Sequence, residues 1–253
     1  DSSAASDVYK RQDIIMAIDV SSSMLAQDLK PDRLSALKRV ASSFIDDRLS
    51  DRIGLVVYAG ESYTKTPITS DKSIVKGALR EIAYQGLIED GTAIGIGFAT
   101  SVNRLKDSKA KSKVIILLTD VVNNSGFIDP KTASELATEY GIKTYTIGLG
   151  SNGMALSPVA LNNGVFQYAR VQVEIDEKLL KEIAYETGGK YFRATDNKKL
   201  EEIYEEIDLL EKTEIEEFKY YNYEEKFRPL VLLALGLIVI EFLLKHSLLR
   251  GFL

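Results

Sequence analysis

Five side chains that bear oxygen have types and spacing that suit metal binding. Asp19, Ser21 and Ser23 place one carboxylate and two hydroxyls at alternate positions of DVSSS. Because alternate positions of an extended chain point the same way, these three groups can converge on one point. Thr92, at the end of EDGT, adds a third hydroxyl, and Asp120, after the apolar run KVIILLT, adds a second carboxylate.

An oxygen-only set of this kind predicts a site for a hard divalent cation. Mg²⁺ takes oxygen ligands in octahedral geometry at about 2.0 to 2.1 Å and keeps water where protein ligands are missing. Mn²⁺ and Ca²⁺ are the alternatives. With only two full negative charges around it, the cation stays electrophilic and would accept a carboxylate from a partner protein. The competing interpretation is that these Ser and Asp side chains only cap helices at strand ends.

The composition excludes several other chemistries. In 253 residues there is no Cys and one His, His246, which removes thiolate and His-clustered zinc sites and makes a Ser-His-Asp triad hard to build. The net charge of −5 argues against a nucleic-acid partner. The segment 196–226 has 12 acidic residues against 5 basic ones, a local charge of −7 that leaves the rest of the chain at +2, and we interpret this acidic segment as a solvated helix face.

Apolar runs and amphipathic segments alternate along the chain and predict the fold. Short, nearly continuous apolar runs indicate buried strands at 13–20, 52–58, 113–119 and 143–149, with 63–67 as a weaker edge strand. Helical spacing of apolar residues occurs at 34–45, 74–82, 93–105, 130–140, 176–187 and 200–210. This order predicts an α/β fold, a doubly wound and mostly parallel Rossmann-like sheet flanked by helices. Ligands of such sheets bind outside the carboxyl ends of the strands, where the oxygen-bearing residues fall.

An apolar segment near the carboxyl end predicts a membrane helix. The run at 230–244 is interrupted only by Glu241 and is flanked by basic residues. A spanning helix needs about 20 apolar residues, so we expect a transmembrane helix over 229–246, with a buried core helix as the alternative. The expected layout is a non-native or truncated leader at 1–12, the sheet domain at 13–213, a juxtamembrane linker at 214–228, the transmembrane helix, and a short tail at 247–253.

The spacing of the oxygen-bearing residues resembles the metal-ion-dependent adhesion site (MIDAS) of the von Willebrand factor A (VWA) domain. The Asp-x-Ser-x-Ser motif of that family is matched by Asp19, Ser21 and Ser23, its Thr by Thr92 and its strand-end Asp by Asp120. The resemblance extends from residue 13 to about residue 191. It implies that the two Ser and the Thr contact the metal directly and that the two Asp often act through water.

Further segments resemble the BatA branch of the bacterial aerotolerance (Bat) proteins, which are membrane-anchored VWA proteins. They are DVSSSMLAQDL, DRIGLVVYAGES, IEDGTAIG, VIILLTDVVNNS and GGKYFRATDN. The resemblance implies a VWA domain on the periplasmic side of the bacterial inner membrane, with a MoxR-type AAA+ ATPase and sister Bat proteins as partners. It further implies a binding role in envelope stress or aerotolerance without enzyme activity. The chain departs from the family at Val121, because Gly usually follows the metal-site Asp.

Two other functions are compatible with the sequence. A metal-dependent phosphohydrolase would use the same cation as a Lewis acid, and a purely structural membrane anchor would need no metal. The pattern GLGSNG at 148–153 matches a dinucleotide fingerprint, but Pro158 follows instead of a helix, so we interpret it as a turn. The stretch 151–173 that it opens is expected to be a loop or hairpin near the ligand edge of the sheet.

Overall fold

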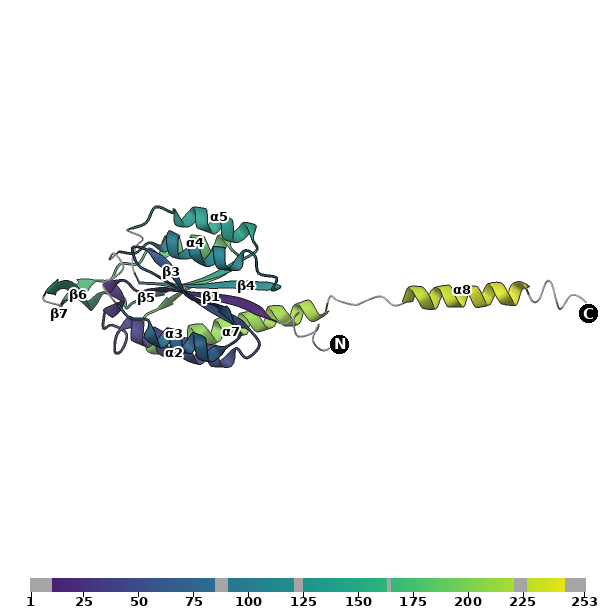
Figure 1. Ribbon diagram of the computed structural model, residues 1–253, viewed down its shortest axis with the longest axis horizontal. Helices are drawn as coiled ribbons and strands as arrows, with labels where there is room; N and C mark the ends of the chain where they lie inside the picture. Colours follow the sequence, from purple (N-terminus) through teal and green to yellow (C-terminus); the bar gives the residue numbers. More distant parts are fainter. Residues whose placement is uncertain (1–10, 85–90, 121–124, 163–164, 221–226, 244–253) are drawn as a thin grey trace, which may run out of the picture. The chain divides into compact units, whose positions relative to one another are not determined.

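A mostly parallel sheet forms the centre of the protein (Figure 1). The computed structural model describes residues 11–84, 91–120, 125–162, 165–220 and 227–243. The sheet strands are β1 (Gln12–Asp19), β2 (Arg52–Tyr58), β3 (Ser62–Thr69), β4 (Ser112–Thr119), β5 (Lys143–Leu149) and β8 (Tyr191–Ala194). They lie in the order β3-β2-β1-β4-β5-β8, with β3 antiparallel to β2 and the other neighbouring pairs parallel. The predicted α/β fold with a mostly parallel sheet is therefore confirmed.

The central strands form because their apolar runs are covered on both faces. Every residue of β1 is buried, as are the last six residues of β2 and of β4, which is typical of parallel strands between helix layers. The apolar pattern is weaker in the two edge strands of the sheet, β3 and β8. In β3 only Thr66 is buried, and β8, which the sequence analysis missed, has four residues of which every second one is buried.

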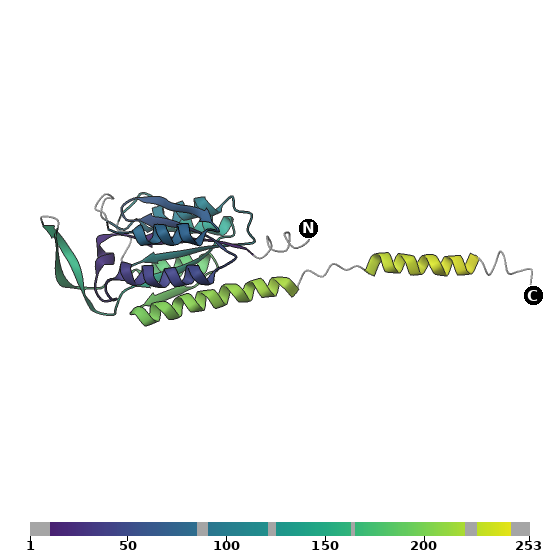
Figure 2. The same cartoon turned by 60° about the horizontal axis from the view of Figure 1, so that its bottom comes forward.

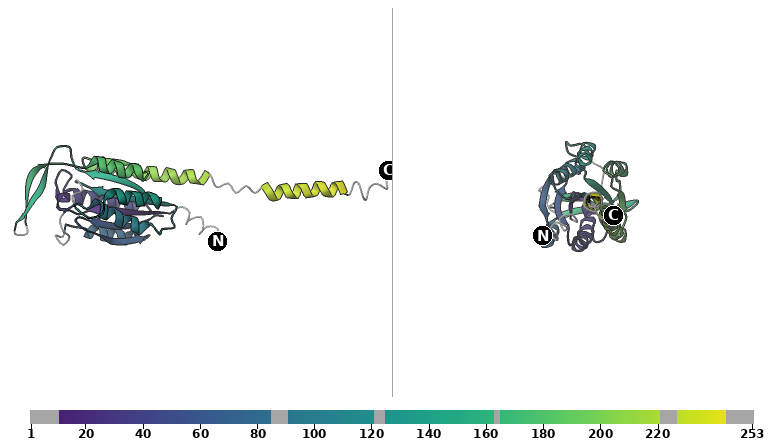
Figure 3. Two further views of the ribbon diagram at one scale, coloured as in Figure 1. Left: turned by 90° about the horizontal axis from the view of Figure 1, so that it is seen from above. Right: turned by 90° about the vertical axis from the view of Figure 1, so that its right-hand side faces the viewer.

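Helices cover both faces of the sheet (Figures 1 and 3). One face is covered by α2 (Arg33–Asp47), α3 (Lys72–Glu81) and the beginning of α7 (Asn197–Tyr220), and the other by α4 (Ile94–Leu105), α5 (Pro130–Glu139) and α6 (Glu177–Glu186). Five of these helices begin after an Asp whose carboxylate accepts a backbone N–H of the first turn, namely Asp32, Asp71, Asp129, Asp176 and Asp196. Such caps fix the residue at which each helix starts.

Successive side chains of β1 point to opposite faces of the sheet, which divides the core into two layers. Ile14, Met16 and Ile18 pack with side chains of α2, α3 and α7, whereas Ile15 and Ala17 pack with side chains of α4, α5 and α6. All five are at most 1% exposed. Because a slip of one residue would exchange the two layers, this packing fixes the register of β1. The residues at the carboxyl end of the strand are therefore held in defined positions.

A two-stranded hairpin stands apart from the main sheet, beyond the end to which β5 leads (Figure 2). Its strands β6 (Met154–Asn162) and β7 (Val165–Gln172) pair antiparallel, so the expected loop or hairpin over 151–173 is a hairpin. Gly150 and Gly153 precede it with φ of +146° and +113°, values that favour glycine. A strand follows these glycines instead of a helix, which agrees with a turn and not with a dinucleotide site.

The residues from 211 onward form a second compact unit. Its helix α8 (Phe227–Leu243) exposes apolar side chains at Val231, Leu232, Leu233, Leu235, Leu237, Ile238 and Ile240. No helix among the described residues is long and apolar enough to cross a membrane. The transmembrane helix expected over 229–246 is therefore not found there, and residues 244–246 lie outside the described ranges.

Two element boundaries differ from the expected layout. Gln12, which the layout assigns to the leader, is the first residue of β1, is buried, and donates its backbone N–H to Asp51 at 3.0 Å. At the other end, α7 continues to Tyr220 and so extends into the segment 214–228 that the layout assigns to a linker.

The contact of α4 with β2 leaves no room for a side chain at Gly97. A Cβ there would lie 2.5 Å from the ring of Tyr58, which is fully buried. We expect Gly97→Ala to lower the free energy of unfolding by about 1–3 kcal/mol, the usual cost of overpacking a core. Gly77→Ala on α3, where a Cβ meets nothing within 4 Å, should raise it by up to about 1 kcal/mol. Urea unfolding measures both variants, and equal effects would contradict this account of the packing.

Candidate metal site

The candidate site lies where the connections of the sheet change direction. β1 has β2 on one side and β4 on the other, so the chain first builds toward one edge and then toward the opposite one. Ligands of open α/β sheets bind at such a switch point. Ile18 pairs with Leu118. Asp19, the last residue of β1, and Asp120, which follows β4, therefore lie at adjacent strand ends.

Two hydrogen bonds hold the Asp19 carboxylate. The backbone N–H of Ser21 donates to Oδ1 at 2.9 Å, and the hydroxyl of Thr119 donates to Oδ2 at 2.9 Å. Asp19 and Thr119 are both fully buried. The bond from Ser21 closes the turn that follows β1, and the two predicted serines belong to this turn.

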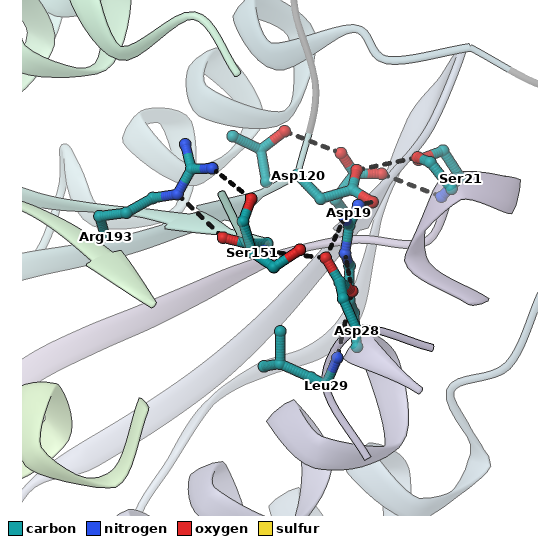
Figure 4. Close-up of polar contacts among 11 residues, drawn as sticks. Asp19, Ser21, Asp28, Leu29, Asp120, Ser151 and Arg193 are labelled. Carbon is teal, nitrogen blue, oxygen red and sulfur yellow. Dashed lines mark hydrogen bonds and ion pairs between the residues drawn. The ribbon is translucent and has the colours of Figure 1, made fainter. Parts of the chain in front are cut away.

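The serines connect this turn to Asp120. Ser21 Oγ lies 3.0 Å from Ser23 Oγ, and Ser23 Oγ donates to Asp120 Oδ1 at 2.8 Å. Ser21 and Asp120 are buried, while Ser23, in the short 3₁₀ helix η1 (Ser22–Leu25), is half-buried. The structure thus joins four of the five predicted residues, Asp19, Ser21, Ser23 and Asp120, in one network, and Figure 4 labels Asp19, Ser21 and Asp120. We call these four residues the oxygen cluster.

Thr92 reaches the same edge of the sheet from another loop. Its neighbour Ala93 donates a backbone hydrogen bond at 2.7 Å to Ala59, which follows the end of β2, the strand that pairs with β1. Thr92 is 1% exposed, and its carbonyl accepts from the Ser125 N–H at 3.3 Å. The fifth predicted residue therefore lies at the carboxyl edge together with the oxygen cluster. Residues 89–90, which precede it in EDGT, and Val121 lie outside the described ranges.

A buried ion pair that the sequence analysis missed holds the second oxygen of Asp120. Arg33 Nη1 donates to Asp120 Oδ2 at 2.6 Å. Nε and Nη2 of the same guanidinium donate to the two oxygens of Asp28 at 2.8 and 2.6 Å. Arg33 is the first residue of α2, where the helix dipole disfavours a cation. A basic residue at this position is the one signal in the sequence that could have indicated a carboxylate partner.

The network continues to the beginning of the hairpin. The backbone N–H of Ser151 donates to Asp28 Oδ2 at 2.8 Å. Arg193 on β8 donates to the carbonyls of Gly150 and Ser151 at 3.0 and 3.1 Å (Figure 4). Gln27, one residue before Asp28, donates its N–H to the Leu156 carbonyl on β6 at 2.9 Å. The hairpin is therefore attached to the loop that follows the serines of the oxygen cluster.

Burial is the largest cause that raises the pKa of both site carboxylates. Burial, followed by the negative charge of Asp120, raises the pKa of Asp19 to about 8, although the hydrogen bonds from Ser21 and Thr119 act in the opposite direction. Burial also raises the pKa of Asp120, and the charge of Arg33 offsets part of that rise. For Asp28, burial raises the pKa, but the hydrogen bonds and charge of Arg33 outweigh it, so this pKa is lowered. Both site carboxyls, Asp19 and Asp120, therefore keep a proton up to a higher pH than an exposed carboxyl does.

The residues present fit a hard divalent cation. Their donors are hydroxyl and carboxylate oxygens, which Mg²⁺ prefers, and a divalent charge would relieve the repulsion that raises the pKa of Asp19. Each oxygen of Asp19 and Asp120 already accepts one hydrogen bond. Within the described residues, no group of three or more His, Cys, Asp or Glu side chains could hold a metal ion instead.

Comparison with known proteins agrees with this architecture. Residues 13–206 match the family model of the von Willebrand factor type A domain. The chain belongs to this family. The conserved hypothetical protein BatB from Bacteroides thetaiotaomicron, whose crystal structure is known, is 32% identical in sequence to this chain. The match covers 79% of this chain and 98% of the BatB chain, and the two structures superpose with a TM-score of 0.69. An aerotolerance-related membrane protein from Bacteroides fragilis is 29% identical with the same coverage and a TM-score of 0.68.

Two further comparisons concern the length of the protein and the metal. An uncharacterized protein from Borreliella burgdorferi is 28% identical over 239 residues, which cover 94% of this chain and 70% of that protein. Proximal thread matrix protein 1 from the mussel byssus shares the VWA fold and is 23% identical in sequence to this chain. The match covers 79% of this chain and 46% of the mussel protein's chain, and the two structures superpose with a TM-score of 0.61. Its structure contains a zinc-occupied MIDAS motif, so a VWA domain can hold a metal there. The relationship to Bat proteins is confirmed, and the BatA branch stays a prediction because the named solved relative is a BatB.

The buried carboxyl of Asp19 should lower the stability of the VWA domain at neutral pH, because the folded chain keeps protonated a group that is ionised in the unfolded chain. The pKa of Asp19 is about 8 in the folded chain against an ordinary 3.8. Between these values the folded chain binds the proton more tightly than the unfolded chain does, so stability falls as the pH rises from about 4 to about 8 and then levels off. Asp19→Asn removes this effect and keeps an acceptor for the Ser21 N–H.

Urea unfolding in chelator measures this effect across that pH range. The free energy of unfolding of Asp19→Asn relative to the wild type should increase steadily with pH. A difference that does not change with pH would contradict the raised pKa of Asp19.

Proposed function

We propose that this chain is a protein-binding VWA module that holds a divalent cation of the Mg²⁺ type, with Mn²⁺ or Ca²⁺ as substitutes. Its ligands are the side chains of Asp19, Ser21, Ser23, Thr92 and Asp120. The observation that supports this most directly is the buried oxygen cluster at the switch point, in which Ser23 links Ser21 to Asp120. When bound, the cation supplies a Lewis-acidic position for a carboxylate of the partner protein.

The chain's own residues determine what that position attracts. Three of the five ligands, Ser21, Ser23 and Thr92, are neutral hydroxyls and cancel none of the cation's charge. The two carboxylates are bound on both oxygens by neighbouring groups, so they act at longer range through water. The loaded site therefore keeps positive character and selects a negatively charged side chain over a neutral one.

The contacts favour binding over hydrolysis. A metal-dependent phosphohydrolase needs a carboxylate that is free to attack the phosphorus or to take a proton. Both oxygens of Asp19 and both oxygens of Asp120 already accept hydrogen bonds within the fold. We therefore propose no enzymatic activity for this site.

The relatives indicate where such a module works. One solved relative is named BatB and another an aerotolerance-related membrane protein. By this relationship we propose that the module acts at the bacterial inner membrane with its VWA domain in the periplasm. Its proposed partners are a MoxR-type AAA+ ATPase and sister Bat proteins, and its proposed role is in envelope stress or aerotolerance. The exposed apolar side chains of α8 support a location next to the membrane.

Cation binding should depend on the half-buried serine of the oxygen cluster. Ser23→Ala removes the hydroxyl that lies between Ser21 and Asp120, so we expect Mn²⁺ affinity to fall by about ten-fold or more. Ser43→Ala, at an exposed position of α2, is the matched control and should bind as the wild type does. Calorimetric titration of the chelator-stripped full chain with Mn²⁺ gives these affinities. Equal affinity of Ser23→Ala and wild type, or no uptake by the wild type, would contradict the proposed site.

Capture of the partner should require both the cation and the site. A crosslinking pull-down with the full chain in Mg²⁺ should recover a MoxR-type ATPase or a sister Bat protein, and chelator should abolish the recovery. Ser21→Ala and Asp120→Ala should abolish it as well, whereas Asp46→Ala, at an exposed position of α2, should not. Recovery of the same partners by Ser21→Ala and Asp120→Ala in chelator would overturn the proposal.

A further inference from the structure

Arg33 occupies an unfavourable position for a cation. It is the first residue of α2 and is only 2% exposed. The helix dipole disfavours positive charge there, and a buried charge is costly unless it is paired and hydrogen-bonded. The groups that Arg33 contacts must therefore offset these two costs.

The guanidinium directs three nitrogens at two carboxylates. Nε and Nη2 form a fork on Asp28 at 2.8 and 2.6 Å, and Nη1 is left for Asp120 Oδ2 at 2.6 Å. Asp28 anchors one side of the group, and Asp120, which belongs to the oxygen cluster, lies on the other. A planar guanidinium has the fixed geometry that such a double contact needs.

The backbone at the beginning of the hairpin restricts the guanidinium further. Ser151 donates its N–H to Asp28 at 2.8 Å, which fixes the anchor (Figure 4). A Cβ at Gly150 would lie 2.9 Å from Arg33 Nη2, so the backbone of this glycine packs directly against the guanidinium. Arg33 is therefore held with Nη1 directed at Asp120.

We propose that Arg33 is a positioning residue of the metal site, which fixes the Asp120 carboxylate in the orientation that the cation requires. With Oδ2 held by Arg33, Oδ1 stays directed at Ser23. Without this contact the carboxylate can rotate, and Ser23 loses a fixed acceptor. Arg33 acts through Asp120 and does not contact the cation. The inference rests on the proposed function, because it concerns the cation held at the oxygen cluster.

A purely electrostatic role for Arg33 would give a different result from a positioning role. Lys carries the same charge, but its compact ammonium cannot direct N–H groups at both carboxylates in the way a guanidinium does. Arg33→Lys therefore keeps the positive charge but cannot make the simultaneous contacts that the guanidinium makes with Asp28 and Asp120. If only the charge mattered, the affinity for the cation would not change.

The test is titration of the chelator-treated full chain with Mn²⁺, followed by calorimetry and by electron paramagnetic resonance of the ion. We expect Arg33→Lys to bind Mn²⁺ about 10- to 100-fold more weakly than the wild type, as is usual when a group that orients a metal ligand is lost. The matched control is Arg52→Lys. This substitution also removes a guanidinium–carboxylate contact, in which Arg52 Nε donates at 2.7 Å to the buried Asp13 at the opposite end of β1. The Arg52→Lys variant should bind Mn²⁺ as the wild type does.

The outcomes separate this inference from the proposed function. Wild-type affinity in Arg33→Lys would overturn the positioning role and leave the proposed function intact, whereas a wild type that binds no Mn²⁺ would overturn both. Thermal unfolding in chelator shows whether each variant is folded. If Arg33→Lys is not folded, the Mn²⁺ affinity of Asp28→Asn tests the positioning role of Arg33 instead. This substitution weakens the anchor of the fork and should lower the affinity about ten-fold, and wild-type affinity in this variant would overturn the inference.

Discussion

Asp19 and Asp120 are buried beside each other at the ends of two parallel strands, and much of the surrounding structure serves to hold them there. Two carboxylates removed from water lose their hydration and repel each other, and these effects, burial first and the charge of Asp120 second, raise the pKa of Asp19. Each of their four oxygens accepts a bond from a different group, the Ser21 N–H, the Thr119 and Ser23 hydroxyls and the Arg33 guanidinium. These bonds offset only part of the repulsion. The metal-free fold is therefore destabilised at the point where a cation would stabilise it.

The fold tolerates this local cost in stability because apolar packing on both faces of the sheet fixes the positions of its strands. The two layers of the core fix the register of β1, so Asp19 cannot leave the edge without moving apolar residues on both faces. The loop after the serines is held in turn by Asp28, Arg33 and the hairpin. Membership of the VWA family defines this scaffold. What binds at the edge depends on the individual side chains placed there.

The sequence predicts the parts of this structure whose signals are local. Apolar runs marked β1, β2, β4 and β5, and the spacing within one turn identified Asp19, Ser21 and Ser23. The role of Arg33 could not be found in this way, because its contact with Asp120 joins positions 87 apart in the sequence. β8 has four residues, too few for a recognisable period. The expected membrane span followed from the apolar run and its basic flanks, and no helix among the residues that the structure describes is long and apolar enough to cross a membrane.

The central claim is that a divalent cation binds between the two serines and the two carboxylates at the end of β1 and β4. The most direct test is an anomalous difference map from crystals of the protein grown with Mn²⁺. We predict a single strong peak at about 2 Å from Ser21 Oγ and Ser23 Oγ, with Arg33 still bound to Asp120. A strong peak elsewhere on the chain, or no peak at this edge although Mn²⁺ is in excess, would contradict the account.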